Sequence, residues 1–203
     1  MLGLPKSAEI NKQLSKKVIF DRFKPKSGDR RLFDEQINRM SIVAEISPQT
    51  VAIKASVDVA AVYVVQVTLK TPECDKKNIA LLSRLIHQRM LFVLAYGDDA
   101  RLAVYRAGTV LMSERKPLAE WTLQLIGIDL GAIWENVIAQ IGGIDLVDGD
   151  DLDETIAESV RREKLAKRIA LLKAKVMAER QPRKKWKIAE EIRLLKIELE
   201  EIL

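Results

Sequence analysis

The chain has 203 residues, of which 48% are hydrophobic and 31% charged, with a formal net charge of +5. This length can hold one core-forming domain with an appendage, or two small domains. The single cysteine, Cys74, excludes an internal disulfide and a multi-cysteine zinc site, and no apolar run reaches the roughly 18 residues that span a bilayer.

The N-terminal forty residues predict two helices around a polar loop. The first stretch lacks the apolar core of a secretory signal, so a cytoplasmic protein is expected. Ser7 fits the N-cap of a helix that carries Ile10 and Leu14 at helical spacing. Residues 24–31 are rich in helix breakers and predict a loop, and 32–40 predict a short second helix.

The middle of the chain predicts a sheet. Residues 41–46 and 50–55 favour two short strands around a Ser-Pro-Gln turn. Residues 59–70 form a nearly continuous run rich in β-branched side chains, which is typical of a strand buried on both faces. A turn at 71–77 then leads into a helix with apolar residues at a period near 3.6.

A hairpin and a closing helix complete this region. Residues 91–108 contain two apolar runs separated by Gly-Asp-Asp, which indicates a β-hairpin, and 109–114 extend it as a third strand. Trp121 and Leu125 are expected near the sheet edge. A helix follows and ends at Gly142 and Gly143. The order of elements predicts an α+β domain over 1–143, with a small mixed sheet and flanking helices.

Residues 144–153 read as an acidic linker. The segment has several aspartates, but the ligand spacing of a calcium-binding loop is absent, so we expect no metal there. Asp153 and Glu154 suit the positive N-terminal end of a following helix. Residues 154–203 then form the last predicted unit.

The last unit, 154–203, predicts an antiparallel two-helix coiled-coil hairpin. Apolar residues step by three and four on both sides of Pro182, and proline fits the first turn of a new helix. One turn position brings four layers into register at once: Val176 with Ile188, Leu172 with Ile192, Ile169 with Leu195, and Leu165 with Leu199. Because two helices bury little area, the hairpin is expected to pack on its own domain, a second copy or a partner.

Charge is distributed unevenly. Residues 1–31 carry nine Lys/Arg against three Asp/Glu, residues 32–150 carry eleven against fifteen, and residues 151–203 carry fourteen against eleven. Basic ends suggest an acidic partner such as nucleic acid or an acidic protein surface. The alternative is that the charges only keep the helical segments in solution.

The turn of the hairpin concentrates this charge. Cations at the start of the second helix oppose the helix dipole, so they favour contact with an anion over stability alone. Nucleic acid is the preferred ligand and an acidic protein patch is the rival, while a purely solvated cluster is the third reading. The predicted binding residues are Arg180, Arg183, Lys184, Lys185, Trp186 and Lys187, with Trp186 placed to stack on a base or to anchor a protein contact.

The search for catalytic motifs gives one weak candidate. Phosphate-binding glycine motifs are absent, and His87, the only histidine, has no triad or metal signature around it. A metal-dependent nuclease needs an Asp on one strand and Glu-x-Lys on the next. Asp58 and Lys70 approach this pattern, but Thr68 occupies the glutamate position, for which Glu45 is a possible substitute. No cofactor is expected.

Three segments together resemble a known family. They are the opening MLGLPKS, the central helix followed by the LFVL–VYR hairpin, and the closing ERQPRKK…EIRLLKIEL hairpin. They are similar to an uncharacterised bacterial family, a domain of unknown function whose members often accompany helicases and DNA methyltransferases in restriction or phage-defence gene clusters. The resemblance implies a non-enzymatic accessory subunit that binds a larger DNA-acting enzyme, DNA, or both. A degenerate nuclease-like enzyme and an architectural homodimer formed through the arm are the alternatives.

Overall fold

A computed structural model describes residues 2–85, 88–144 and 151–200. The chain divides into two compact units, Met1–Leu146 and Val147–Leu203. We call the first unit the body and the second the arm. The division falls within the segment 144–153.

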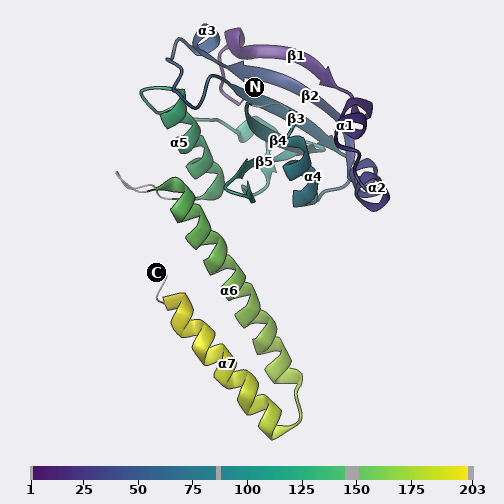
Figure 1. The fold of residues 1–203 in the computed structure, drawn as a ribbon, viewed down its shortest axis with the longest axis vertical. Helices are drawn as coiled ribbons and strands as arrows, with labels where there is room; N and C mark the ends of the chain where they lie inside the picture. Colours follow the sequence, from purple (N-terminus) through teal and green to yellow (C-terminus); the bar gives the residue numbers. More distant parts are fainter. Residues whose placement is uncertain (1, 86–87, 145–150, 201–203) are drawn as a thin grey trace. The chain divides into compact units, whose positions relative to one another are not determined.

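A mixed sheet forms the centre of the body (Figure 1). Its neighbouring strands follow chain order, and every adjacent pair is antiparallel except β3 with β4, which is parallel. Two parallel strands must be joined by a crossover connection, and the one between β3 and β4 contains α4 (Lys76–Leu82). The strands are β1 (Glu9–Leu14), β2 (Ile37–Ile46), β3 (Val62–Leu69), β4 (Arg89–Tyr96), β5 (Asp99–Arg106) and β6 (Thr109–Met112), with a short β7 (Lys116–Pro117) that pairs with β5.

Helices supply the rest of the body core. Ile19 of α1, Phe33 of α2 and Ile79 of α4 lie in one buried cluster with side chains of β3 and β4. The helix α5 packs against β5 and β6 and buries Trp134. The body helices are η1 (Lys6–Ala8), α1 (Lys16–Phe23), α2 (Ser27–Gln36), α3 (Pro48–Val51), α4, η2 (Leu118–Glu120) and α5 (Leu130–Gly142). The predicted α+β class is therefore confirmed.

The predicted N-terminal helix is wrong, because β1 occupies its first half. Ile10 and Leu14 are four residues apart, which fits one face of a strand as well as one face of a helix. They are the two half-buried positions of β1, which forms the sheet edge beside β2. Ser7 is not an N-cap; its hydroxyl donates to the carbonyl oxygen of Thr50 at 2.6 Å.

Two further boundaries differ from the predictions. The expected loop 24–31 and helix 32–40 are replaced by α2, which begins at Ser27 and ends at Gln36, where β2 begins. The expected strand 50–55 does not form, because α3 (Pro48–Val51) takes its first two residues and 52–55 lie in neither a helix nor a strand. Its N-cap, Ser47, forms a capping box with Thr50, whose hydroxyl oxygen accepts from the Ser47 N–H at 2.9 Å. Pro48 occupies the first helical position, so Ser-Pro-Gln starts a helical turn and does not join two strands.

Most central elements match their predictions. Strand β3 and the β4–β5 hairpin lie where the sequence pattern placed them, and the hairpin turns at Gly97, which has a φ of 60°. Helix α4 forms as predicted but ends at Leu82, and Met90, expected near its end, lies in β4. Asp129 caps α5 by accepting from the Ala132 N–H at 2.9 Å. The indole N–H of Trp121 donates to the carbonyl oxygen of Ala100 in β5 at 3.0 Å, so this ring lies at the sheet as expected.

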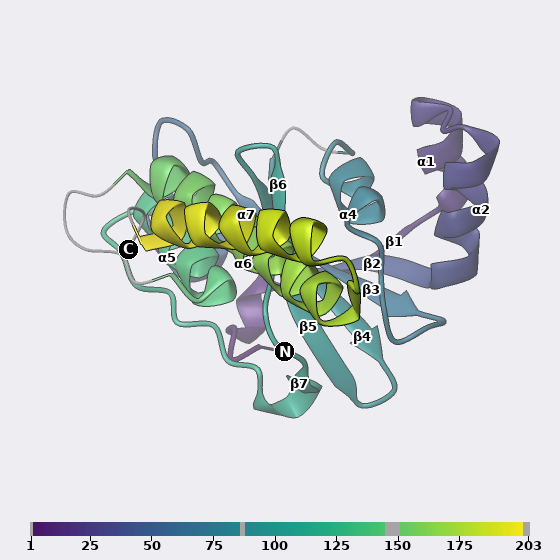
Figure 2. The ribbon, with the colours of Figure 1, turned by 90° about the horizontal axis from the view of Figure 1, so that it is seen from below.

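The arm consists of α6 (Leu152–Ala178) and α7 (Pro182–Glu200), which run antiparallel and side by side (Figures 1 and 2). The predicted reversal at Pro182 is confirmed. Asp151 caps α6 and accepts from the N–H of Asp153 at 2.8 Å, and Asp153 and Glu154 occupy the first turn as predicted. Ile202 and most of the acidic linker lie outside the described residues. Within the described ranges, none of the helices has the length and apolar content needed to cross a membrane.

Candidate functional site

The turn of the arm is closed by hydrogen bonds at both helix ends. Glu179 ends α6, and its N–H donates to the carbonyl oxygen of Lys175 at 3.0 Å. Its carboxylate accepts from the Gln181 N–H at 2.9 Å, and the Gln181 carbonyl accepts from the Lys185 N–H at 3.0 Å. Pro182 is the first residue of α7, where a missing N–H costs no helical hydrogen bond. The sequence therefore fixes a short, defined turn.

Glu179 is the one carboxylate of this turn. The backbone N–H of Gln181 holds the pKa of Glu179 below its usual value. Desolvation opposes this effect on the pKa, while the Arg180 N–H and the charges of Lys184 and Lys175 lower the pKa further. The carboxylate is therefore ionised at neutral pH, and it accepts a hydrogen bond from the backbone just before α7.

Two ion pairs link the helices of the arm and report its register. Arg161 pairs with Glu198 at 2.7 Å, and Arg168 pairs with Glu191 at 2.6 Å. A step of seven residues forward on α6 matches a step of seven residues back on α7, so the antiparallel register does not slip between the two pairs. All four side chains are partly exposed, so each pair is worth about 0–1 kcal/mol and serves mainly to fix the alignment.

Burial along the arm follows the predicted seam, which is the line of paired apolar layers along which the two helices face each other. Leu165 and Ile169 are buried. The other seam residues of both helices are half-buried: Leu172, Val176, Ile188, Ile192, Leu195 and Leu199. Leu171 and Leu194 lie off the seam and are exposed. The apolar stripes therefore face each other, as the heptad pattern predicts.

The cations predicted to bind a ligand gather at this turn, and we call them the tip cluster: Arg180, Arg183, Lys184, Lys185 and Lys187. All five are exposed. Within the described part of the chain, no carboxylate lies at ion-pair distance from any of them. The first turn of α7 contains no acidic residue. The tip cluster is thus a group of hydrated cations beside the positive end of a helix dipole.

Asp58 and Lys70, the weak nuclease candidates, are not brought together. Asp58 precedes β3 and Lys70 follows it, and an eight-residue strand spans roughly 26 Å at about 3.3 Å per residue. The Lys70 ammonium donates to the carbonyl oxygen of Asp34 at 2.6 Å. Glu45 pairs with Tyr63 at the far end of β3 from Lys70. The Asp58 and Glu45 carboxylates therefore do not lie with the Lys70 ammonium at one nuclease-like site.

Within the described ranges, no other carboxylate takes the place of the glutamate that the nuclease pattern lacks at Thr68. The positions of β2 opposite Gln66 and Thr68 are Ser41 and Arg39, which supply no carboxylate. Among the described residues, no group of three or more His, Cys, Asp or Glu side chains could hold a metal ion. His87 lies outside the described residues.

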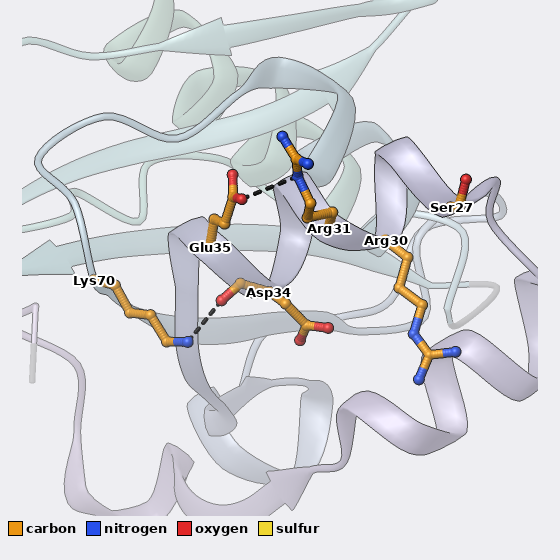
Figure 3. Close-up of a pocket in the computed structure, with 6 residues that line it drawn as sticks. All are labelled: Ser27, Arg30, Arg31, Asp34, Glu35 and Lys70. Atoms are coloured by element: carbon orange, nitrogen blue, oxygen red, sulfur yellow. Dashed lines mark hydrogen bonds and ion pairs between the residues drawn. The ribbon is translucent and has the colours of Figure 1, made fainter.

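A charged hollow of about 520 Å³ lies on α2 beside Lys70 (Figure 3). Arg31 and Glu35 point toward one another and pair at 3.1 Å, while Asp34 pairs with Lys16 at 3.1 Å. The guanidinium of Arg30 lies 4.7 Å from the centre of the Phe20 ring. These cations already have partners within the chain, so the hollow suits an anion less well than the tip cluster does.

The sequence pattern does not predict this hollow, because the helix breakers in 24–31 favour a loop there. The i,i+4 spacing of Arg31 and Glu35 was a local signal for a helix there. The approach of Lys70 depends on tertiary structure and had no such signal.

Cys74 is an unreactive thiol in the folded chain. Its side chain is buried, and burial raises its pKa to about 12, with smaller contributions in the same direction from Asp75 and Glu73. A hydrogen bond with Asn78 acts in the opposite direction. A nucleophilic cysteine needs a lowered pKa and exposure, and Cys74 has neither.

Two loops of the body expose apolar side chains. Val57 is fully exposed, and Ile126 and Ile128 also point into solvent. The two loops meet where the Leu130 N–H donates to the carbonyl oxygen of Lys54 at 2.9 Å. Exposed aliphatic groups of this kind are typical of protein contact surfaces when they gather in one patch.

Comparison with known proteins gives a match at the family level. Neither the search of curated proteins nor the search of solved structures gave a match. The model of one family, described as a domain of unknown function (DUF4391), matches residues 2–199. This match spans the body and nearly the whole arm, including the tip cluster. The chain therefore belongs to the DUF4391 family.

Proposed function

We propose that this protein is a non-enzymatic accessory subunit whose tip cluster binds nucleic acid while its body docks on a larger DNA-acting enzyme. Such an enzyme would be a helicase or a methyltransferase of a bacterial restriction or phage-defence system, since the family resemblance implies a genomic context of this kind. The tip cluster is the observation that carries the proposal. Its cations are exposed, and none of them forms an ion pair within the part of the chain that the structure describes.

Stability alone does not account for these charges. Arg183, Lys184 and Lys185 stand in the first turn of α7, where a cation costs about 0.3–1 kcal/mol against the helix dipole. A phosphate group placed at the same helix end would be attracted by both the dipole and the side chains. Nucleic acid presents phosphates in a row, so several of these cations would contribute at once.

The body offers a different kind of surface for a protein partner. Val57, Ile126 and Ile128 are exposed aliphatic residues of two loops that are joined by a backbone hydrogen bond. Burial of such side chains contributes about 1.5–3 kcal/mol each when water is fully removed. These exposed side chains support the docking part of the proposal, while the tip cluster supports the nucleic-acid part.

Charge reversal tests the role of the tip cluster. In the variant Arg183→Glu, Lys184→Glu, Lys185→Glu, Lys187→Glu, we expect the affinity of the full chain for labelled DNA to fall by on the order of a hundredfold or more, because four phosphate contacts become repulsive. Fluorescence anisotropy measures the affinity, and circular dichroism checks that the helices persist.

A matched control separates a site from general electrostatics. Lys6, Lys12, Lys17 and Lys26 are exposed residues of the basic N-terminal segment, and their change to Glu gives a protein of the same net charge. This control should retain most of the affinity. Equal losses in both variants would show that the tip cluster is not the binding site, and an intact affinity in the tip variant would reject the proposal.

A further inference from the structure

We infer that the tip binds single-stranded nucleic acid in preference to duplex, with Trp186 as the surface on which a base stacks. This inference rests on the proposed function and specifies its ligand. The structure points to it through the exposure of one tryptophan, its place on the arm and the charges around it.

Trp186 differs from the other two tryptophans of the chain. Trp134 is 2% exposed in the body core, and Trp121 donates its indole N–H to the carbonyl oxygen of Ala100. Trp186 is 68% exposed on α7. A ring in this position contributes little to the core of the arm, and both of its flanking residues, Lys185 and Lys187, are exposed cations. Its aromatic face is therefore available to a ligand.

The heptad positions place Trp186 on one broad face of the arm. Both arginines and both glutamates of the two Arg–Glu pairs directly precede an a position of the seam, so all four occupy heptad position g. In an antiparallel hairpin the g positions of the two helices lie on the same face, so both pairs lie on that face. Val176 and Lys185 occupy heptad position a, so the residues that follow them, Met177 and Trp186, occupy position b. In an antiparallel hairpin the b positions of both helices lie on the face opposite to the Arg–Glu pairs. Met177 is also exposed, at 84%. This face has an aromatic and a flexible apolar side chain next to the turn.

Cations surround the apolar pair on the same side of the turn. Lys173 lies four residues before Met177 on α6, and Arg183 lies three residues before Trp186 on α7, which are spacings that bring helical side chains side by side. Arg180 lies in the turn between the two helices. A helical side chain covers the turn that precedes it, so the indole lies toward Pro182 and Arg183. Flat apolar surface and phosphate-binding charges therefore occur together.

This combination selects single strands. In a duplex the base faces are stacked on one another, so an exposed indole gains nothing from them and only the cations contribute. An unpaired strand presents base faces and phosphates in alternation, and stacking on an aromatic ring is worth about 1–3 kcal/mol per base. An acidic peptide would use the same cations but has no base to stack, which makes it the competing outcome of the test.

The experiment compares the full chain with three single variants on two probes. The probes are a labelled oligothymidylate of about 20 nucleotides, which exceeds the roughly 4–16 nucleotides that one single-strand-binding module covers, and a blunt duplex of the same length. Trp186→Ala should lose about five- to a hundredfold affinity for the single strand and keep its duplex affinity within about twofold. Trp186→Phe should recover much of the loss. Leu194→Ala, an exposed change on the opposite face, is the matched control and should alter neither affinity.

Tryptophan fluorescence gives a second readout of the same contact. Trp134 and Trp121 are held in the body, so quenching of the exposed Trp186 by the oligonucleotide should disappear in Trp186→Phe. Equal affinity of Trp186→Ala and the parent for the single strand would overturn the inference and leave the proposed function intact. Failure of the parent chain to bind either probe would overturn both the proposed function and this inference. If Trp186→Ala lost binding to polyglutamate but kept its binding to DNA, the face around Trp186 would be assigned to an acidic protein partner.

Discussion

Several residues of the opening segment MLGLPKS have structural roles that the geometry makes plain. Leu2 and Leu4 of the opening MLGLPKS are buried, and the Leu2 carbonyl accepts from the Leu123 N–H at 3.0 Å. Gly3 lies between them with a φ of 71°, and a Cβ there would stand 2.8 Å from Cγ2 of Thr122. Glycine is needed both for the left-handed backbone and for the close approach. This motif therefore anchors the N-terminus and is explained by packing.

Cys74 gives a prediction at the same scale. Burial raises its pKa to about 12, so at neutral pH the thiolate fraction is on the order of 10⁻⁵. A thiol reagent should therefore label the native chain very slowly and the denatured chain completely. The folded pKa lies above the ordinary value of 9.0, so the contribution of this thiol to stability is full below about pH 9 and is lost as the pH rises toward 12. Native labelling at the rate of a free cysteine would contradict the burial of Cys74.

At the scale of elements, the sequence predicted best where one local pattern decides the structure. The arm has two uniform heptad stripes and a proline between them, so local signals alone define both helices and the turn. The strand at 62–69 and the helix at 130–142 have long, one-sided patterns as well. The tip cluster follows directly from the turn, which is why its residues could be named before the structure was known.

Prediction failed where short patterns fit two structures. Ile10 and Leu14 satisfy the spacing of a helix and of a strand, and only pairing with β2 decides for the strand. Residues 50–55 have strand-like composition, but the capping box of Ser47 and Thr50 starts a helical turn first. The hollow on α2 needs Lys70 from the end of β3, and no local pattern predicts such a tertiary contact.

The seam of the arm can be tested with a pair of neighbouring substitutions. Ile169 is buried and Leu171 is exposed on the same helix. Ile169→Asp places a carboxylate in the seam, which costs several kcal/mol, and should melt much of the arm. Leu171→Asp loses at least as much helix propensity, since leucine is the better helix former, but its carboxylate stays in water, so its effect should remain near about 0.5 kcal/mol. Far-UV circular dichroism during heating measures both. Equal effects would show that the two helices do not pack along this seam.

At the scale of the whole molecule, the chain has two basic regions with different surroundings. In the N-terminal segment, several cations have partners: Lys16 pairs with Asp34, Arg31 with Glu35, and Arg30 lies over Phe20. The tip cluster has its cations in water, together at one turn. Net charge alone does not distinguish these regions as ligand sites. The grouping of exposed cations at one turn does, and it favours the tip.

The salt dependence of DNA binding measures this difference most directly. Each phosphate contact with a single strand contributes about −0.7 to the slope of log K against log salt. Changing Arg183, Lys184, Lys185 and Lys187 to Gln should therefore make the slope shallower by up to about 3, because up to four contacts are lost. The same change at Lys6, Lys12, Lys17 and Lys26 should leave the slope nearly unchanged. An unchanged slope in the tip variant, with a shallower one in the N-terminal variant, would place the nucleic-acid contact on the body and contradict the account.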